Sequence, residues 1–236
     1  MKRSDEALVL QFRLLRAQIE TRLPAPAAIA VTSASEHDGK TATAYGLAEA
    51  FVAAGYSTAI VNAGEGTSSN ASVEIRSISI PHAAAEIPLK LGVANRTDRL
   101  DEIIMPTRAT GFFSRDVIQM IVNELRENYD YTVIDTTRLL KSDLALLLTG
   151  AASATLIAAR LGRPRAAEDR RMMAALESVD ANVLGVVAVS EKTIANFVRS
   201  ESSARKALPE AGRQQTRLQS ASVADAPHPG IAGSRG

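Results

Sequence analysis

The chain has 236 residues, of which 46% are hydrophobic and 22% charged, and this composition is that of an ordinary water-soluble protein large enough for one domain with its own core. Its net charge of +1 gives no indication of a nucleic-acid partner, and we expect none. The absence of cysteine excludes disulfides and thiolate metal sites.

Neither the N-terminal residues nor the uncharged run near the middle of the chain predicts a cleavable signal or a membrane span. Residues 1–20 mix charges throughout and have no apolar stretch of the kind that a cleavable signal needs. Residues 144–159 are uncharged, but the run is shorter than the roughly 20 residues that span a bilayer. We interpret this run as a helix end, a turn and a buried strand, and we expect no direct membrane span.

Segments typical of strands and helices alternate along the chain. Residues 4–22 carry apolar side chains at helical spacing and stop before Pro24, so they predict a first helix. The predicted strands are Ala27–Thr32, Ser57–Val61, Tyr131–Ile134, Ala154–Ala159 and Val183–Val189. The later predicted helices are Lys40–Ala54, Ser114–Glu127, Pro164 to about Val179 and Lys192 to about Lys206. Such alternation predicts the α/β class, with a predominantly parallel sheet covered by helices on both faces.

Two regions do not follow this pattern. Residues 64–90 are rich in Ser, Gly, Asn and Pro, and we expect long loops with short elements there. From Leu208 onward Pro, Gly, Ser, Ala and Gln dominate, which predicts disorder. We therefore divide the chain into an N-terminal helix (1–23), a domain (24–206) and a disordered tail (207–236).

The stretch VTSASEHDGKTATAYGLAEAF, residues 31–51, joins the first predicted strand to a helix through Gly39-Lys40-Thr41. In a phosphate-binding loop, backbone N–H groups point at phosphate oxygens, a lysine neutralises them, and a threonine hydroxyl ligates Mg²⁺. Ala34 stands where the strict pattern has its first glycine, so a surface turn is the alternative interpretation. The residues predicted to bind the nucleotide are Ser35, Glu36, His37, Asp38, Gly39, Lys40, Thr41 and Ala42.

A second motif supports the first. The run YDYTVIDTT, residues 129–137, is an apolar strand that ends in Asp135, the place from which a Walker B carboxylate reaches the Mg²⁺ shell. An aspartate that merely caps the following turn is the alternative. The two motifs in this order are stronger than either alone, and they predict a P-loop NTPase-like three-layer sandwich that binds ATP and Mg²⁺. Thr41 and Asp135 are the predicted metal ligands, and Asp135 is predicted to be catalytic.

The chain resembles the cytoplasmic ATPase domain of the bacterial tyrosine kinases in the capsular and exopolysaccharide co-polymerase family, a branch of the MinD/ParA-like P-loop ATPases. The resemblance covers roughly residues 8–200 and rests on five pieces in order. They are FRLLRAQI (12–19), the β-α-β stretch 31–61, SRDVIQMIVNELRENYDYTVIDT (114–136), ARLGRP (159–164) and VLGVV (183–187). The loop residues Ser33, Ala34 and Ser35 include no lysine, which argues against the partition-type branch with its signature lysine.

This resemblance implies a partner and a cellular location. The expected partner is a membrane chain-length-determining co-polymerase protein, and a homo-oligomer is left open. The expected location is the cytoplasm, with attachment at the inner membrane only through that partner.

Several positions depart from the family pattern. The family ends its second strand with Asp-x-Asp, whereas this chain has Asn62-Ala63-Gly64, so Asn62 is a degenerate catalytic position. An amide cannot act as a base and favours Mg²⁺ less than a carboxylate does. His37 replaces a glycine, and its Cβ costs stability wherever the backbone needs a positive φ. Glu36 adds an acid beside a site that should be electropositive.

Two other family features are missing. Leu10 stands where the ring-forming Glu-x-x-Arg-x-x-Arg motif has its glutamate, so Arg13 and Arg16 are interpreted as a solvated helix face. No tyrosine follows Tyr131, which argues against self-phosphorylation of a tail.

The leading functional hypothesis is therefore a degenerate, ATP-binding regulatory domain of exopolysaccharide or capsule chain-length control and export, with weak or absent ATPase and tyrosine kinase activity. Two alternatives stay open. One is an active ATPase or protein-tyrosine kinase in which another carboxylate covers for Asn62, and the other is an interaction module that binds no nucleotide.

Overall fold

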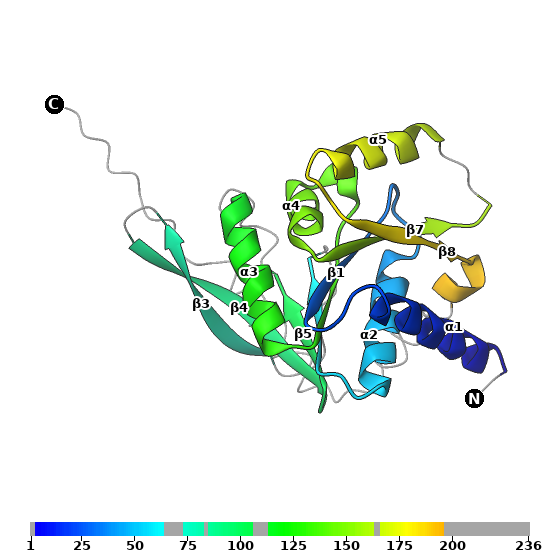
Figure 1. Cartoon of the computed structure of the whole chain (residues 1–236), viewed down its shortest axis with the longest axis horizontal. Coiled ribbons are helices and arrows are strands. Elements are labelled where there is room, and N and C mark those ends of the chain that lie inside the picture. Colours follow the sequence, from blue (N-terminus) through cyan, green and yellow to red (C-terminus); the bar gives the residue numbers. More distant parts are fainter. Residues whose placement is uncertain (1–2, 64–72, 83–84, 106–112, 163–165, 196–236) are drawn as a thin grey trace, which may run out of the picture.

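The computed structural model describes residues 3–63, 73–82, 85–105, 113–162 and 166–195 (Figure 1). The predicted tail (207–236), Gly64 and most of the predicted last helix lie outside these residues. The described helices are α1 (Arg3–Glu20), α2 (Lys40–Ala53), α3 (Arg115–Asn128), α4 (Asp143–Ala151) and α5 (Ala166–Glu177), with a short 3₁₀ helix η1 (Leu139–Lys141). The strands are β1 (Ala27–Thr32), β2 (Thr58–Asn62), β3 (Val73–His82), β4 (Ala85–Thr97), β5 (Leu100–Ile104), β6 (Tyr131–Asp135), β7 (Ala154–Arg160) and β8 (Val183–Val189).

The strands form one eight-stranded sheet in the order β3-β4-β5-β2-β6-β1-β7-β8. The pairs from β5 to β8 are parallel, and the pairs of β4 with β3 and with β5 are antiparallel. The sheet is therefore predominantly parallel, as predicted. In the centre, β1, β2 and β6 are buried along their whole length, which explains their near-continuous apolar sequences.

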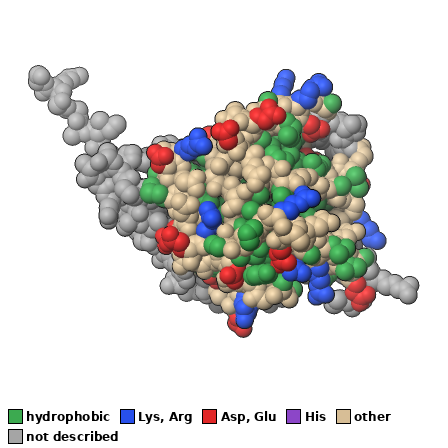
Figure 2. All heavy atoms as spheres, viewed as in Figure 1, with side chains coloured by type: hydrophobic (Ala, Val, Ile, Leu, Met, Phe, Trp, Pro, Cys, Tyr) green, Lys and Arg blue, Asp and Glu red, His purple; other side chains and the backbone are tan. Residues whose placement is uncertain are grey.

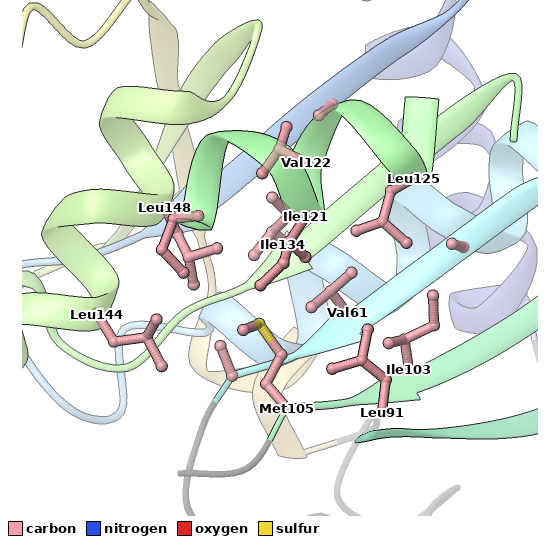
Figure 3. Close-up of a cluster of buried hydrophobic side chains, with 14 of the residues drawn as sticks. Val61, Leu91, Ile103, Met105, Ile121, Val122, Leu125, Ile134, Leu144 and Leu148 are labelled. Atoms are coloured by element: carbon pink, nitrogen blue, oxygen red, sulfur yellow. The ribbon is translucent and has the colours of Figure 1, made fainter. Parts of the chain in front are cut away.

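Helices cover both faces of the sheet and make it a three-layer sandwich (Figure 1). One core lies under α3 and α4, where apolar side chains of both helices meet those of the strands (Figure 3). The labelled side chains in that view include Val61, Ile103, Ile121, Ile134 and Leu148. A second core lies on the opposite face, where α2 and the end of α1 pack on β1, β2 and β6. The P-loop-like three-layer architecture predicted from the sequence is confirmed.

The prediction of long loops for residues 64–90 is wrong for its described part. Residues 73–82 and 85–97 form an antiparallel hairpin, β3–β4, at one end of the sheet (Figure 1). The many Ser and Pro residues of this segment are typical of loops, and they outweighed the alternation of Ile78-Ser79-Ile80, which has the period of two expected of a strand. Pro81 lies in the edge strand, and Pro88 lies in the part of β4 that pairs only with β3, so neither proline removes a hydrogen bond from a central ladder.

On the face shown in Figure 2, acidic and basic side chains are interspersed among the described residues, without a large patch of one sign. None of the helices in the described part of the chain has the length and apolar character that a membrane crossing requires. On α1, Leu10 and Arg13 are exposed, as expected for a solvated helix face, but Arg16 is partly buried: its side chain is 22% exposed and pairs with Glu20 at 2.7 Å.

Candidate phosphate and metal site

Three neighbouring strands bring the predicted site residues to one edge of the sheet. Strand β6 lies between β1 and β2, and Asp135 is in register with Val31 on one side and Asn62 on the other. The loop 33–39 follows β1 directly and leads into α2. Because parallel strands end at the same edge of a sheet, residues far apart in the sequence meet there, which is the usual place for ligands in open α/β sheets.

The backbone of the loop has the conformation that its glycine allows. Gly39 precedes α2 with φ 87° and ψ 21°, in the left-handed region, and no side chain caps the helix at that position. A Cβ on Gly39 would also lie 2.6 Å from Cγ1 of Val189, so the end of β8 packs closely against the loop. His37 has a φ of 32°, so its backbone adopts the positive φ at which a residue with a Cβ loses stability compared with glycine.

Lys40 points back into the loop. Its Nζ donates to Ser33 Oγ at 3.1 Å and to the Ser35 carbonyl oxygen at 3.3 Å. Burial lowers the pKa of Lys40, although the nearby Asp135 and Asp38 carboxylates act in the opposite direction. A partly desolvated ammonium held by two neutral oxygens is a cation that gains strongly from an anionic ligand.

Asp135 is a buried carboxyl, 4% exposed, with one oxygen that has no hydrogen-bond partner among the described residues, Oδ1. Burial raises its pKa to about 6, while a hydrogen bond from the Thr41 side chain and the charge of Lys40 lower it. The unpartnered oxygen and the adjacent hydroxyl are hard donors of the kind that Mg²⁺ binds. Thr41 and Asp135 therefore fit the predicted metal site.

The described residues include no group of three or more His, Asp or Glu side chains that could hold a metal ion by themselves. This agrees with Mg²⁺ in phosphate-transferring sites, where one or two protein ligands are completed by phosphates and water. The residues present, a buried carboxylate oxygen of Asp135 and the Thr41 hydroxyl, fit Mg²⁺.

Asn62 is buried and ends β2 beside Asp135, as predicted. At this place beside the carboxyl of Asp135 it brings a neutral amide. Ala42, which was included among the predicted binding residues, is buried in α2 and offers no polar side-chain atom.

Two other predicted loop residues, Ser35 and Glu36, contact charged side chains. The Ser35 N–H donates to Asp38 Oδ2 at 3.0 Å, and the Ser35 hydroxyl donates to Glu168 Oε2 of α5 at 2.7 Å. Glu36 forms an ion pair with Arg138, whose Nη2 lies 2.6 Å from its Oε1. Carboxylates thus contact groups that a phosphate ligand would use.

Sequence reasoning missed Arg138 and Glu168, which come from the segment after β6 and from α5. The only signal for Arg138 was its place three residues after Asp135. It also missed Glu102 on β5, a buried acid whose Oε1 accepts a hydrogen bond from Tyr45 at 2.8 Å. The charge of Glu102 within the apolar run LDEII was a signal that could have been noticed.

The fold and the loop together define an α/β domain of the P-loop type. No family model and no curated protein matches the chain. Among solved structures, the kinase domain of Escherichia coli tyrosine kinase ETK is similar, with a TM-score of 0.60 and 18% identity over 78% of this chain and 76% of that one. The chimerical protein CapA2B2 is similar with a TM-score of 0.58 and 20% identity, over 75% of this chain and 82% of that one.

A Cyanothece McdA–ATP complex is also similar, with a TM-score of 0.51 and 16% identity over 78% of this chain and 80% of that one. At these identities the likeness establishes the fold. That fold is the P-loop-like α/β sandwich predicted from the sequence, and the ETK kinase domain and McdA share it.

Proposed function

We propose that this chain is an ATP-binding regulatory domain that hydrolyses ATP slowly or not at all and acts in exopolysaccharide or capsule assembly. The observation that carries the proposal is the meeting of Lys40, Thr41 and Asp135 at the adjoining ends of β1 and β6. The likeness of the fold to a tyrosine kinase domain and to McdA, which was solved with ATP, supports it.

Each of these residues has a distinct part in binding. Lys40 would leave Ser33 and the Ser35 carbonyl for phosphate oxygens, because a hydrogen bond between charged partners is stronger than one to a neutral oxygen. Asp135 and Thr41 would hold Mg²⁺ through the unpartnered carboxylate oxygen and the hydroxyl. Bound Mg·ATP would supply a phosphoryl group that can be transferred.

Slow hydrolysis follows from Asn62. Its amide lies beside Asp135 at the end of β2, where a carboxylate would help to hold Mg²⁺ and orient the attacking group. Loss of a general base alone typically costs about 10²–10⁴-fold in rate. We therefore propose that binding is retained and that chemistry is impaired.

An active ATPase or protein-tyrosine kinase is the second candidate, and Glu102 is the observation that favours it. This carboxylate is buried on the sheet face that also carries Asn62 and Asp135, and its charge raises the pKa of Asp135 after the larger effect of burial. However, Glu102 accepts from Tyr45 at 2.8 Å and pairs with Arg96 at 3.4 Å. Because both oxygens have partners, Glu102 is less available than an aspartate at position 62 would be.

The pathway and the partner rest on the family resemblance. We propose a membrane chain-length-determining co-polymerase as the partner, with this domain on the cytoplasmic side. A module that binds no nucleotide and only docks on that partner is the remaining alternative. Self-assembly through α1 is left open, because Leu10 replaces the glutamate of the ring-forming motif.

A nucleotide titration with and without Mg²⁺ tests the proposal. Isothermal titration with ATP and with ADP should show binding that Mg²⁺ strengthens for the wild type and that Lys40→Ala abolishes. A parallel phosphate-release assay should stay near background. Binding with rapid turnover would favour the active enzyme, and no heat at millimolar Mg·ATP would favour the docking module.

A further inference from the structure

Arg138 lies beside the phosphate loop because backbone hydrogen bonds tie the segment after β6 to the segment after β1. The Thr136 N–H and hydroxyl both donate to the Val31 carbonyl, at 3.2 and 3.0 Å. The Leu139 N–H donates to the Ser33 carbonyl at 3.3 Å. Arg138 is therefore held by its neighbours on both sides against the loop 33–39, which the Lys40 ammonium contacts at Ser33.

The guanidinium of Arg138 reaches the loop itself. Its Nη2 lies 2.6 Å from Glu36 Oε1, and its side chain is 30% exposed, whereas that of Glu36 is 62% exposed. Arg138 also lowers the pKa of Lys40, after the larger effect of burial, so the two cations are close enough to repel each other. The cations of Arg138 and Lys40 both reach the same loop. Glu36, the partner of Arg138, is the more exposed member of that ion pair.

Such an arrangement suits a ligand with several negative charges. A phosphate could take the place of the Glu36 carboxylate at little cost, since an ion pair on the surface contributes little to stability and the exposed Glu36 can be hydrated by water. The planar guanidinium can bind two oxygens of one phosphate through two parallel N–H donors in a fixed geometry, whereas an ammonium acts as a compact point charge. The same segment carries two buried oxygens without a partner among the described residues, Asp135 Oδ1 and Thr137 Oγ1.

We propose that Arg138 is a second phosphate-binding cation of this site, which exchanges Glu36 for an oxygen of the terminal phosphates when a nucleotide binds. This inference rests on the proposed nucleotide binding and assigns one more ligand to the same site. Glu36 is then a competitor that occupies Arg138 in the absence of nucleotide. It has no part in holding the phosphate.

The opposite roles of the two partners give the test. Dissociation constants for Mg·ATP are measured by isothermal titration for the wild type, Arg138→Ala, Arg138→Lys and Glu36→Gln. Arg138→Ala should weaken binding about 10- to 100-fold, the usual effect of losing a charged hydrogen bond, with Arg138→Lys in between. Glu36→Gln should strengthen binding about two- to fivefold. Arg16→Ala, which removes a comparable arginine from an ion pair on α1, should leave the constant unchanged.

The signs separate this inference from a purely structural role. If the Arg138–Glu36 pair only braces the loop, removing either partner weakens binding alike, and that result overturns the inference. An unchanged constant for Arg138→Ala and Arg138→Lys overturns it too, while leaving the proposed function intact. Absence of binding by the wild type and by Glu36→Gln refutes the proposed function, and the inference falls with it. Circular dichroism and melting curves confirm that each variant is folded.

Discussion

Replacing Asp135 by asparagine should make the ligand-free protein more stable at neutral pH, because the buried carboxyl is costly to ionise. Its pKa is raised from 3.8 to about 6 by burial. Below about pH 4 the carboxyl is protonated in both the folded and the unfolded chain, and stability does not depend on it. Between about pH 4 and 6 the unfolded chain releases this proton while the folded chain still holds it, so stability is lost as the pH rises across this range, and above about pH 6 the loss stays constant.

The size of this loss follows from the difference between the two pKa values. At about 1.4 kcal/mol for each tenfold change, it corresponds to about 3 kcal/mol at pH 8. Asparagine cannot ionise and can still accept the Thr41 hydrogen bond, but its NH₂ group replaces an oxygen that has no partner among the described residues. We therefore expect a gain of about 2–3 kcal/mol, or about 4–12 °C in Tm for a domain of this size.

Melting curves of both proteins between pH 4.5 and 8 measure the effect. The advantage of Asp135→Asn should grow as the pH rises and shrink toward pH 4.5. Asp98→Asn is the control, since it removes an equal charge from the exposed turn between β4 and β5. Mg·ATP should stabilise the wild type and much less the variant, which lacks a charged metal ligand. An advantage that is independent of pH, or a less stable variant at pH 8, would refute the reasoning.

Three other changes address the loop, the degenerate position and the packing of α1. Lys40→Ala should abolish thermal stabilisation by millimolar Mg·ATP while leaving the unliganded Tm nearly unchanged, because its ammonium is desolvated and bonds only neutral oxygens; differential scanning fluorimetry checks both. Asn62→Asp should raise the rate of ATP hydrolysis about tenfold in a phosphate-release assay, since it places a carboxylate beside Asp135. If the wild type hydrolyses ATP rapidly and the substitution leaves that rate unchanged, the active enzyme is favoured. Gly46→Ala should destabilise the fold by about 1–3 kcal/mol in urea, because its Cβ would lie 2.3 Å from the Phe12 ring and displace that ring from its packing on α2. A paired Phe12→Ala, Gly46→Ala variant should recover part of the loss attributed to the clash.

Much of the fold was predictable because its signals are local. A continuous apolar run, a glycine before a helix and helical spacing of apolar residues depend only on neighbours in the chain, and β1, α2, α3, β6 and β8 were all predicted from them. The β3–β4 hairpin was not. Antiparallel strands at a sheet edge alternate polar and apolar residues and tolerate proline, so their composition is similar to that of loops.

Some features of the candidate site were also predictable from local sequence, whereas others depend on how the strands pair. Sequence placed Lys40 and Thr41 at the start of a helix and Asp135 at the end of a strand, since both motifs are contiguous. The hydrogen bond between Thr41 and Asp135 needs β6 to lie next to β1, which the pairing of the strands confirms. For Asn62, the sequence predicted the loss of a carboxylate, and the register of β2 with β6 shows that it lies beside Asp135.

By itself, the sequence determined the class of the fold and the chemistry that its candidate phosphate loop can offer. The tertiary structure decided which charges meet at that loop. Glu168 contacts Ser35 from 133 residues away, Arg138 pairs with Glu36, and both contacts depend on how α5 and the end of β6 pack against the loop. The physical reason is that backbone conformation is set largely by neighbouring residues, whereas the electrostatic environment of a buried lysine depends on every charge that folding brings within a few ångströms.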